Sequence, residues 1–293
     1  MHCDYKANLQ WVRQWCSQIQ ARSSKGSGGS GSSTSTGSGS GDGARRCFTV
    51  LLIPGDIASN PTTFRATLEA ARAAFDETVI VPGNHDLWHT SSLQAEGVTD
   101  SLGKLEWVHR VAAEVGVRSR PCRLRTPRGA LLYLVPLLSW YHPSWDQEPD
   151  LPPATLAALY DGRASFEQRW ADFRLCKWPE AVVAKEDFVS TTTDSTALAD
   201  LFAAMNAPYL ARDPLLADPA ARREEGEGEG PVVVISFSHF LPSQELCPEK
   251  RFLIEPNLPK VWMCAGMCVY VAVERPTKNN TPTHLTHPTP QHR

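Results

Sequence analysis

Several features that would assign this chain to a familiar class are absent from its 293 residues. No apolar run reaches the roughly 18 residues of a membrane-spanning helix, and the polar N-terminus has no apolar core like that of a secretory signal peptide. Lys and Arg total 29 against 32 Asp and Glu, a net charge of −3. The chain therefore lacks the basic field that drives non-specific nucleic-acid binding. We expect a cytoplasmic protein with no membrane partner and no indicated nucleic-acid partner.

The cysteines also lack a recognisable pattern. The eight of them are scattered, and no CxxC pair occurs. Cys264 and Cys268 are four residues apart, but the second pair that a structural zinc site needs is missing. This usage predicts reduced, mostly buried thiols in an intracellular protein.

Residues 1–273 are predicted to form a single domain. Residues 23–43 are almost entirely Ser, Gly and Thr, and residues 217–230 are an acidic, glycine-spaced loop. Neither segment has apolar side chains to bury, so we expect a disordered insertion and a surface loop. The Thr/Pro/His-rich residues 274–293 are expected to be a disordered tail.

Apolar periodicity predicts an alternation of helices and strands along this domain. Asn60 and Pro61 are typical of a helix start, and either Asp100 or Ser101 opens the next helix. The alternation indicates a layered α/β domain. Helices are predicted over 4–20, 60–76, 101–115, 163–175 and 194–206, and strands over 48–54, 78–82, 130–138 and 231–237.

Two glycine-led motifs follow predicted strands. The first strand ends in Gly55-Asp56, and the second ends in the tetrapeptide 83–86, Gly-Asn-His-Asp. Open α/β sheets place their chemistry at the carboxyl ends of strands. A carboxylate, an amide oxygen and an imidazole at such an edge could build a cation site that binds phosphate.

The combination GD…GNHD resembles the calcineurin-like metallophosphoesterases. The segments SWYHPSWDQEPD, SHFLPSQELCPEKRFL and EPNLPKV are similar to an uncharacterised subgroup of that family. The resemblance implies a four-layer αββα sandwich of two mixed sheets, with a dinuclear centre at one sheet edge. It implies Mn²⁺, Fe²⁺/Fe³⁺ or Zn²⁺ as cofactor and hydrolysis of a phosphomonoester or phosphodiester by a metal-activated hydroxide. The implied partner is a phosphorylated small molecule or another phosphoester substrate.

The resemblance also implies metal ligands. Asp56 would bridge two metals, Asn84 would supply its carbonyl oxygen, and His239 would be the lone histidine after a strand. His239 taken alone would more often be structural. His2 would be the remaining ligand of the first motif, D-x-H, or else an ordinary terminal residue.

Two residues receive catalytic roles by resemblance. His85 would be a positioned cation or general acid for the leaving oxygen and not a metal ligand. Asp86 would orient the His85 imidazole through a carboxylate–imidazole hydrogen bond. Asn60 stands one position later than the Asp or Asn of the second motif.

Two family motifs are incomplete in this chain. No Asp precedes His2, and no GHxH occurs; His284 and His287 are weak substitutes. We therefore expect one metal to bind more tightly than any second, and impaired activity. Two alternatives stay open: a catalytically retired fold that acts as a protein-binding module, and a gene-model error at both ends of an ordinary enzyme.

Two further groups have weaker assignments. The aromatic residues 140–142 and Trp145 could line the substrate side of the site or pack as an aromatic loop. Lys250 and Arg251 could contact phosphate or lie on a solvated surface.

Overall fold

The structure is a computed structural model that describes residues 2–25, 48–211, 232–262 and 271–274. The predicted acidic loop at 217–230 lies outside these residues. The predicted insertion at 23–43 does so apart from its first three residues, and the predicted tail apart from Glu274.

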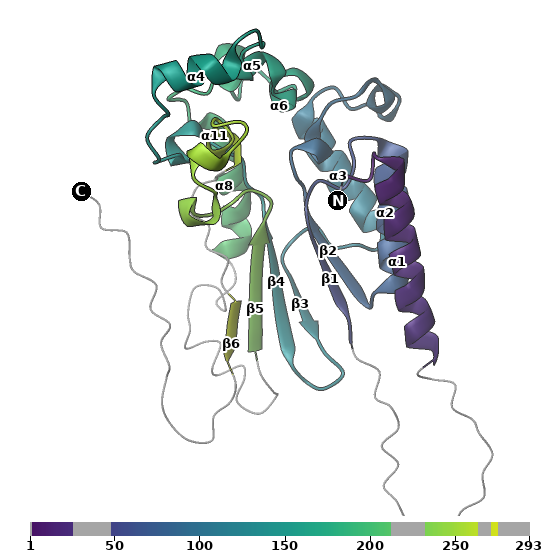
Figure 1. The fold of residues 1–293 in the computed structure, drawn as a ribbon. Helices are drawn as coiled ribbons and strands as arrows, with labels where there is room; N and C mark the ends of the chain where they lie inside the picture. The colour runs from purple at the N-terminus through teal and green to yellow at the C-terminus, as the bar shows by residue number, and fades with distance from the viewer. Residues whose placement is uncertain (1, 26–47, 212–231, 263–270, 275–293) are drawn as a thin grey trace, which may run out of the picture.

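The described chain is a mixed α/β arrangement with two sheets (Figure 1). Its N-terminal half contains α1 (Lys6–Lys25), β1 (Val50–Pro54), α2 (Pro61–Ala74), β2 (Glu77–Val81), η1 (His85–Leu87), η2 (Ser91–Glu96) and α3 (Ser101–Val115). Next come β3 (Cys122–Arg125), β4 (Leu131–Leu137), η3 (Pro143–Trp145), α4 (Pro153–Tyr160), α5 (Phe166–Arg169), α6 (Ala171–Leu175), α7 (Lys185–Phe188) and α8 (Ala197–Leu210). The last elements are β5 (Val232–Ser238), η4 (Gln244–Leu246), η5 (Lys250–Phe252), α11 (Pro259–Trp262) and β6 (Val271–Glu274).

The smaller sheet pairs β1 with β2 in parallel, with Val50 opposite Glu77 and Pro54 opposite Val81. The larger sheet has the order β3-β4-β5-β6. Within it β4 and β5 are parallel, whereas β3 and β6 are antiparallel to their neighbours. Because β1 and β2 run in the same direction, the loops that follow them leave the same edge of the sheet.

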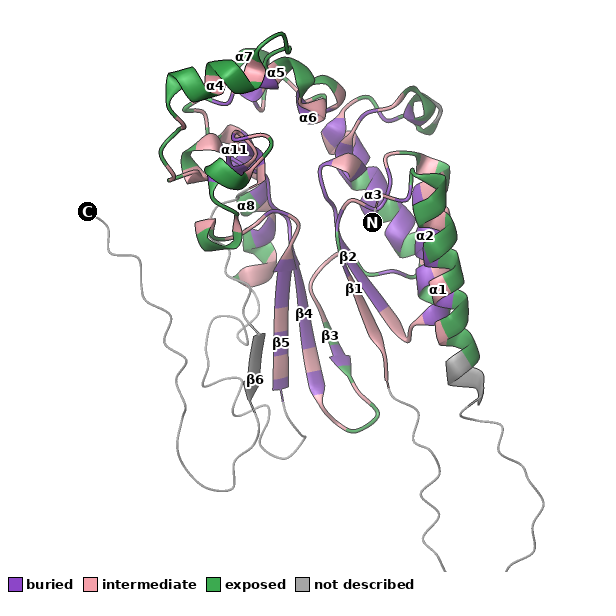
Figure 2. Ribbon diagram, viewed as in Figure 1, coloured by how far each residue is buried: buried purple, intermediate pink, exposed green. Residues whose placement is uncertain are grey.

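The core explains why β2 is apolar at consecutive positions. Ile80 belongs to the cluster formed with α1, α2 and α3, whereas Val79 and Val81 belong to the cluster that includes β4 and β5. All three side chains are fully buried, and the ribbon of β2 is drawn mostly in the buried colour (Figure 2). Strands buried on both faces read as continuous β-branched runs, so β2 lies between the helices and the second sheet. A third cluster, on β4 and β5, packs against Leu210 of α8.

Helix starts follow the predicted caps. Asn60 Oδ1 accepts a hydrogen bond from Thr63 N at 3.0 Å, and Pro61 is the first residue of α2. Asp100, of the two predicted candidates, caps α3 by accepting from Gly103 N at 2.8 Å. Both contacts satisfy N–H groups that have no partner inside the helix.

The helix predicted at 163–175 is divided in two. Trp170 has extended backbone angles (φ −66°, ψ 121°), which end α5 and precede α6. The Trp170 indole Nε1 donates to Asp172 Oδ2 at 3.1 Å. The break therefore lets two side chains that are two residues apart point toward each other, which a continuous helix prevents.

Among the described residues, Cys3, Cys16 and Cys176 are buried free thiols, and Cys122 and Cys247 are half-buried free thiols. The other three cysteines, Cys47, Cys264 and Cys268, lie outside the described residues. Among the helices that the structure describes, none has both the length and the apolar character needed to cross a membrane.

His109 in α3 makes folding pH-dependent. It is 8% exposed, its Nδ1 lies 2.8 Å from Ser119 Oγ, and its buried Nε2 has no partner. Burial, with a smaller contribution from Arg120, lowers its pKa from 6.5 to about 4. Between these values the unfolded chain binds a proton that the folded chain does not, so stability falls as pH decreases from about 6.5 to about 4.

We expect the wild type to lose about 2 kcal/mol of unfolding free energy between pH 7 and pH 5 through this histidine. His109→Gln should remove that part of the pH dependence, because glutamine does not titrate. Urea unfolding of both proteins at the two pH values measures the difference. Equal losses in the two proteins would show that His109 titrates alike in the folded and unfolded chains.

Candidate metal centre

Two loops that touch each other form the base of the site. Gly55 (φ 81°) and Asp56 (φ 54°) are both left-handed, so the chain turns sharply after β1. A Cβ on Gly55 would lie 2.6 Å from Gly83 N, and a Cβ on Gly83 would lie 2.6 Å from Asp56 N. Only glycine permits this close approach, which is the physical reason for the two glycine-led motifs.

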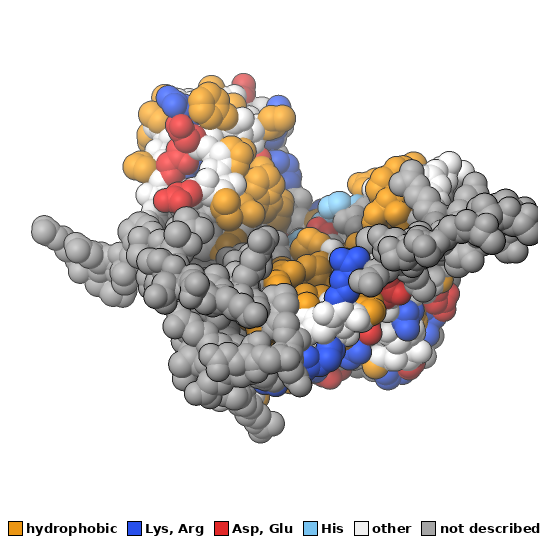
Figure 3. All heavy atoms as spheres, turned by 90° about the horizontal axis from the view of Figure 1, so that it is seen from below, with side chains coloured by type: hydrophobic (Ala, Val, Ile, Leu, Met, Phe, Trp, Pro, Cys, Tyr) orange, Lys and Arg blue, Asp and Glu red, His pale blue; other side chains and the backbone are white. Residues whose placement is uncertain are grey.

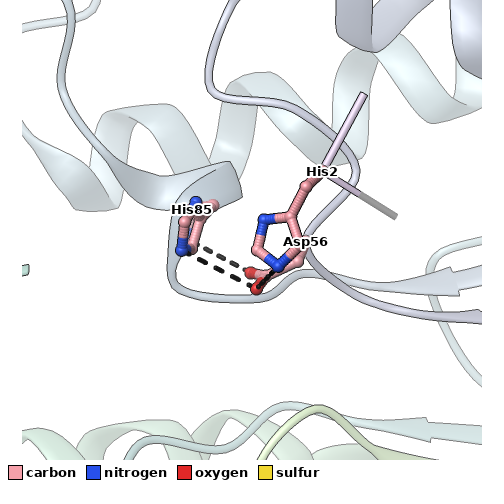
Figure 4. A group of neighbouring side chains, drawn as sticks. All are labelled: His2, Asp56 and His85. Carbon is pink, nitrogen blue, oxygen red and sulfur yellow. Dashed lines mark hydrogen bonds and ion pairs between the residues drawn. The ribbon is translucent and has the colours of Figure 1, made fainter. Parts of the chain in front are cut away.

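Asp56 lies at the centre of the site, with each carboxylate oxygen facing a different set of groups. Its Oδ2 is 3.4 Å from His2 Nε2 and 3.9 Å from His85 Nε2 (Figure 4). Its Oδ1 is 3.4 Å from His239 Nε2 and accepts from His85 N at 3.1 Å. The space-filling view shows histidine atoms exposed in a notch between two raised parts of the surface (Figure 3).

The orientations of His239 and Asn84 are fixed by hydrogen bonds. His239 Nδ1 is 2.8 Å from the Pro54 carbonyl oxygen, which can only accept, so Nδ1 carries the proton. Asn84 donates through Nδ2 to Asp172 Oδ1 at 2.8 Å. The remaining atoms of the two side chains, His239 Nε2 and Asn84 Oδ1, face each other at 2.9 Å.

His2, predicted as either a ligand or a loose terminal residue, is held in place by the loop after β1. Its backbone N–H donates to Asp56 O at 2.6 Å, and Cys3 N donates to Ile57 O at 2.7 Å. Its ring lies edge-on to that of His85, with centroids 4.4 Å apart. The backbone at His2 is therefore anchored to the loop after β1, which places its side chain beside Asp56 and His85.

The structure thus brings His2, Asn84 and His239 around Asp56, the four residues predicted as metal ligands. It also adds His85. The ligand atoms of His2, Asp56 and His85 all lie within 4.8 Å of one another, a spacing at which they could hold a metal ion. The resemblance implies a catalytic role for His85 and not a place among the ligands.

The environment of His85 keeps its imidazole neutral. Burial lowers its pKa from 6.5 to about 4, and His2 and His239 add to this effect while Asp56 opposes it. The ring packs on Trp88, with centroids 3.6 Å apart. At pH 7 the side chain is therefore a neutral donor or acceptor and not the positioned cation considered from the sequence.

The prediction that Asp86 orients the His85 ring differs from the structure. Asp86 Oδ1 accepts from Ile57 N and Ala58 N at 2.8 and 2.9 Å, and Oδ2 accepts from Gly83 N at 2.9 Å. His85 and Asp86 are consecutive in the 3₁₀ turn η1, and consecutive side chains of such a turn point in different directions. Asp86 therefore joins the loop after β1 to the loop after β2.

The fully buried Asp86 carboxyl is also electrostatically perturbed. Burial and the nearby Asp56 raise its pKa to about 6, against the lowering effect of its hydrogen bonds from Gly83 and Ala58. Loss of contact with water disfavours the charged form. The hydrogen bonds between the two loops thus depend on the Asp86 carboxylate, whose burial in the charged form costs free energy.

Trp140 and Lys250, for which the sequence left two alternatives open, are both buried in the structure. Trp140 is buried and packs against Trp178 and Phe202, which favours the packed-loop interpretation. Lys250 is 1% exposed, lies 2.7 Å from Asp146 Oδ2 and donates to Asp150 Oδ1 at 2.8 Å. It is therefore neither a solvated residue nor a phosphate contact.

Arg251 has a side chain 65% exposed and pairs with Glu249 at 2.7 Å. This position fits the solvated surface that was the alternative to a phosphate contact.

Sequence reasoning missed Asp172. This buried residue of α6 contacts Asn84 although it lies 88 positions later. Nothing in its local sequence marks it, because it follows no strand and belongs to no glycine-led motif.

No protein-family model matches this chain, and no curated protein is detectably similar to it. Among solved structures, the crystal structure of phosphopantetheinyl hydrolase (PptH) from Mycobacterium tuberculosis matches with a TM-score of 0.48 and 18% identity. The match covers 73% of this chain and 65% of that one, so the chain spans less than two thirds of that protein's length.

Proposed function

We propose that this protein is a metal-dependent hydrolase of phosphoesters, with a phosphorylated small molecule as its substrate and a four-layer αββα sandwich as its fold. One observation carries the proposal. With the His239 imidazole neutral and its one N–H directed at Pro54 O, two oxygens, Asn84 Oδ1 and Asp56 Oδ1, face the lone pair of His239 Nε2. A cation among these atoms would relieve their mutual repulsion.

The convergence follows from hydrogen-bond capacity. A neutral imidazole has one N–H, and that of His239 is directed at Pro54 O. The Asn84 amide nitrogen is directed at Asp172, so its oxygen must face His239. Carboxylate oxygen, amide oxygen and imidazole nitrogen form a donor set suited to Mn²⁺, Fe²⁺ or Zn²⁺.

The spacing also fits a metal. Two ligands about 2.1 Å from one ion at tetrahedral angles are about 3.4 Å apart. His239 Nε2 and Asp56 Oδ1 have this separation, which is long for a good hydrogen bond. His2 Nε2 and Asp56 Oδ2 have it as well, so His2, Asp56 and His85 would hold a second ion.

Each part of the site would then have a role in hydrolysis. A bound divalent ion supplies Lewis acidity, which polarises a phosphoryl oxygen and makes water a stronger acid. His85, neutral at pH 7, has one lone-pair nitrogen that would be a ligand and one ring N–H that would donate a hydrogen bond to the phosphoester. Asp86 would keep the two loops in register, and the Trp88 ring would restrict the orientation of His85.

A calorimetric titration with Mn²⁺ tests the proposal. We expect one tight equivalent and a weaker second, because the first donor set is fixed by hydrogen bonds whereas the His2 side chain is 43% exposed. His239→Ala should abolish the tight equivalent, and the matched variant His2→Ala should affect only the weak one. Two equal tight equivalents, or a tight equivalent that survives His239→Ala, would contradict the assignment.

A retired fold that binds another protein is the second candidate, and one observation favours it. Leu246, Phe252 and Ile254 are 59%, 70% and 87% exposed within one short segment. Exposed apolar side chains mark an interaction surface where they form a contiguous patch, and these three lie within nine residues of one another in the chain. Absence of any Mn²⁺ binding in the titration would favour this function over hydrolysis.

A further inference from the structure

One buried carboxylate lies behind the metal centre and comes from a distant part of the chain. Asp172 in α6 has no solvent exposure. Its Oδ1 accepts from Asn84 Nδ2 at 2.8 Å and from Trp88 Nε1 at 2.6 Å, and its Oδ2 accepts from Trp170 Nε1 at 3.1 Å. Two of these three donors belong to the loop that forms the site.

We propose that Asp172 is a positioning residue for the metal centre: it fixes the Asn84 amide so that its oxygen faces the metal, and it holds Trp88 against His85. The proposal rests on the proposed function for the meaning of the Asn84 oxygen. The hydrogen bonds from Asn84 and Trp88 to Asp172 are independent of that proposed function.

The Asn84 amide is nearly symmetric in shape, so its oxygen and nitrogen could exchange places. A turned-over Asn84 would direct its Nδ2 at His239 Nε2, forming an ordinary hydrogen bond and removing an oxygen ligand. That turn would place Oδ1 against Asp172 Oδ1, two acceptors at the 2.8 Å now spanned by a hydrogen bond. A carboxylate can only accept, so it excludes the turned form; an amide or hydroxyl at position 172 would accommodate both.

Asp172 Oδ1 also accepts a hydrogen bond from the residue that packs on His85. Trp88 donates to Asp172 Oδ1, and its ring lies 3.6 Å from that of His85 between centroids. Asp172 thereby restrains the indole that limits the movement of His85. A single carboxylate thus orients one predicted ligand directly and a second residue of the site through its neighbour.

The chemistry of position 172 argues against a purely packing role. A buried carboxylate costs free energy unless donors surround it. A well-packed apolar residue would fill the same space without that cost. The donors at Asp172 include Asn84 and Trp88, so the charge acts on the residues that build the site.

The first experiment compares Asp172→Asn with the matched variant Trp170→Phe, which removes only the contact to Oδ2. Asp172→Asn should weaken the tight Mn²⁺ equivalent about 10- to 100-fold, the range for groups that orient metal ligands. Trp170→Phe should change it less than about 3-fold. Thermal unfolding of both variants reports whether the fold is retained.

A second substitution distinguishes positioning from structural support. In an Asn84→Asp background, Asp172 faces a like charge, whereas an asparagine at position 172 can donate to the new carboxylate. Asp172→Asn should therefore weaken Mn²⁺ binding when residue 84 is Asn and strengthen it when residue 84 is Asp. The same loss in both backgrounds would overturn the proposal.

A measurement without metal separates this proposal from the proposed function. The Asn84 side-chain amide protons should exchange slowly in NMR spectra of the metal-free wild type, relative to those of exposed asparagines. Asp172→Asn, but not Trp170→Phe, should shift the resonances of Asn84 Nδ2 and Trp88 Nε1. Slow exchange with no Mn²⁺ binding would keep the positioning role and remove the metal function. Fast exchange in the wild type would overturn the positioning role. This measurement needs only the wild type, so it decides the question even if Asp172→Asn does not fold.

Discussion

Asp56→Asn is expected to weaken Mn²⁺ binding about 100-fold or more and to abolish metal-dependent hydrolysis of bis-p-nitrophenyl phosphate. The substitution removes the negative charge that both donor sets share, and it leaves at most one oxygen to face them. It should not disturb the backbone, because Asn adopts the left-handed angles of this position (φ 54°) as readily as Asp.

The control for this prediction is Asp161→Asn, the same chemical change at the exposed C-terminal end of α4. It should leave Mn²⁺ affinity and hydrolysis within about 2-fold of the wild type, as expected for a surface change. Thermal unfolding should show both variants folded. Retention of tight Mn²⁺ binding by Asp56→Asn would contradict the central role of this carboxylate.

Asp86→Ala is expected to have the largest effect on stability, about 3 kcal/mol or more. The change leaves three buried N–H groups, those of Ile57, Ala58 and Gly83, without their acceptor. Each unsatisfied buried donor costs about 1–3 kcal/mol, and no water has ready access to this position because Asp86 is fully buried. Urea unfolding measured at pH 7 gives the difference directly.

Asp100→Ala provides a matched comparison, since it also removes a carboxylate that accepts from a backbone N–H. That carboxylate accepts from one N–H at a helix start, and its loss should cost about 1 kcal/mol. Equal losses in the two variants would show that the loops after β1 and β2 do not depend on Asp86.

The elements that could be predicted from the sequence are those specified by local patterns. Apolar runs predicted β1, β2, β4 and β5, and capping residues predicted the starts of α2 and α3. The same local logic placed Asp56, Asn84 and His239 after strands, and parallel pairing of β1 with β2 brings the first two together. Gly55 and Gly83 mark the site in the sequence because the close approach of the two loops requires glycine at both positions.

The parts that could not be predicted depend on contacts between distant residues or on directions of side chains. The partner of Asn84 is Asp172, which is separated from it by two strands and several helices. Adjacent residues were expected to pair, yet Asp86 bonds to backbone groups on another loop. Lys250 resembles a surface residue in sequence, whereas carboxylates that are distant in the chain bury it.

The parallel pairing of β4 with β5 has a kinetic consequence. The chain between Leu137 and Val232 must fold back before the pairing of these strands can form, and closing so long a segment slows folding. His239 follows β5 and Asp172 lies within that segment, whereas β1, α2, β2 and α3 are contiguous along the chain. We therefore expect the N-terminal half to form first, with Asp56 in place and the Asn84 amide not yet oriented by Asp172. Metal affinity would then be acquired late in refolding, when the strand pairing delivers His239.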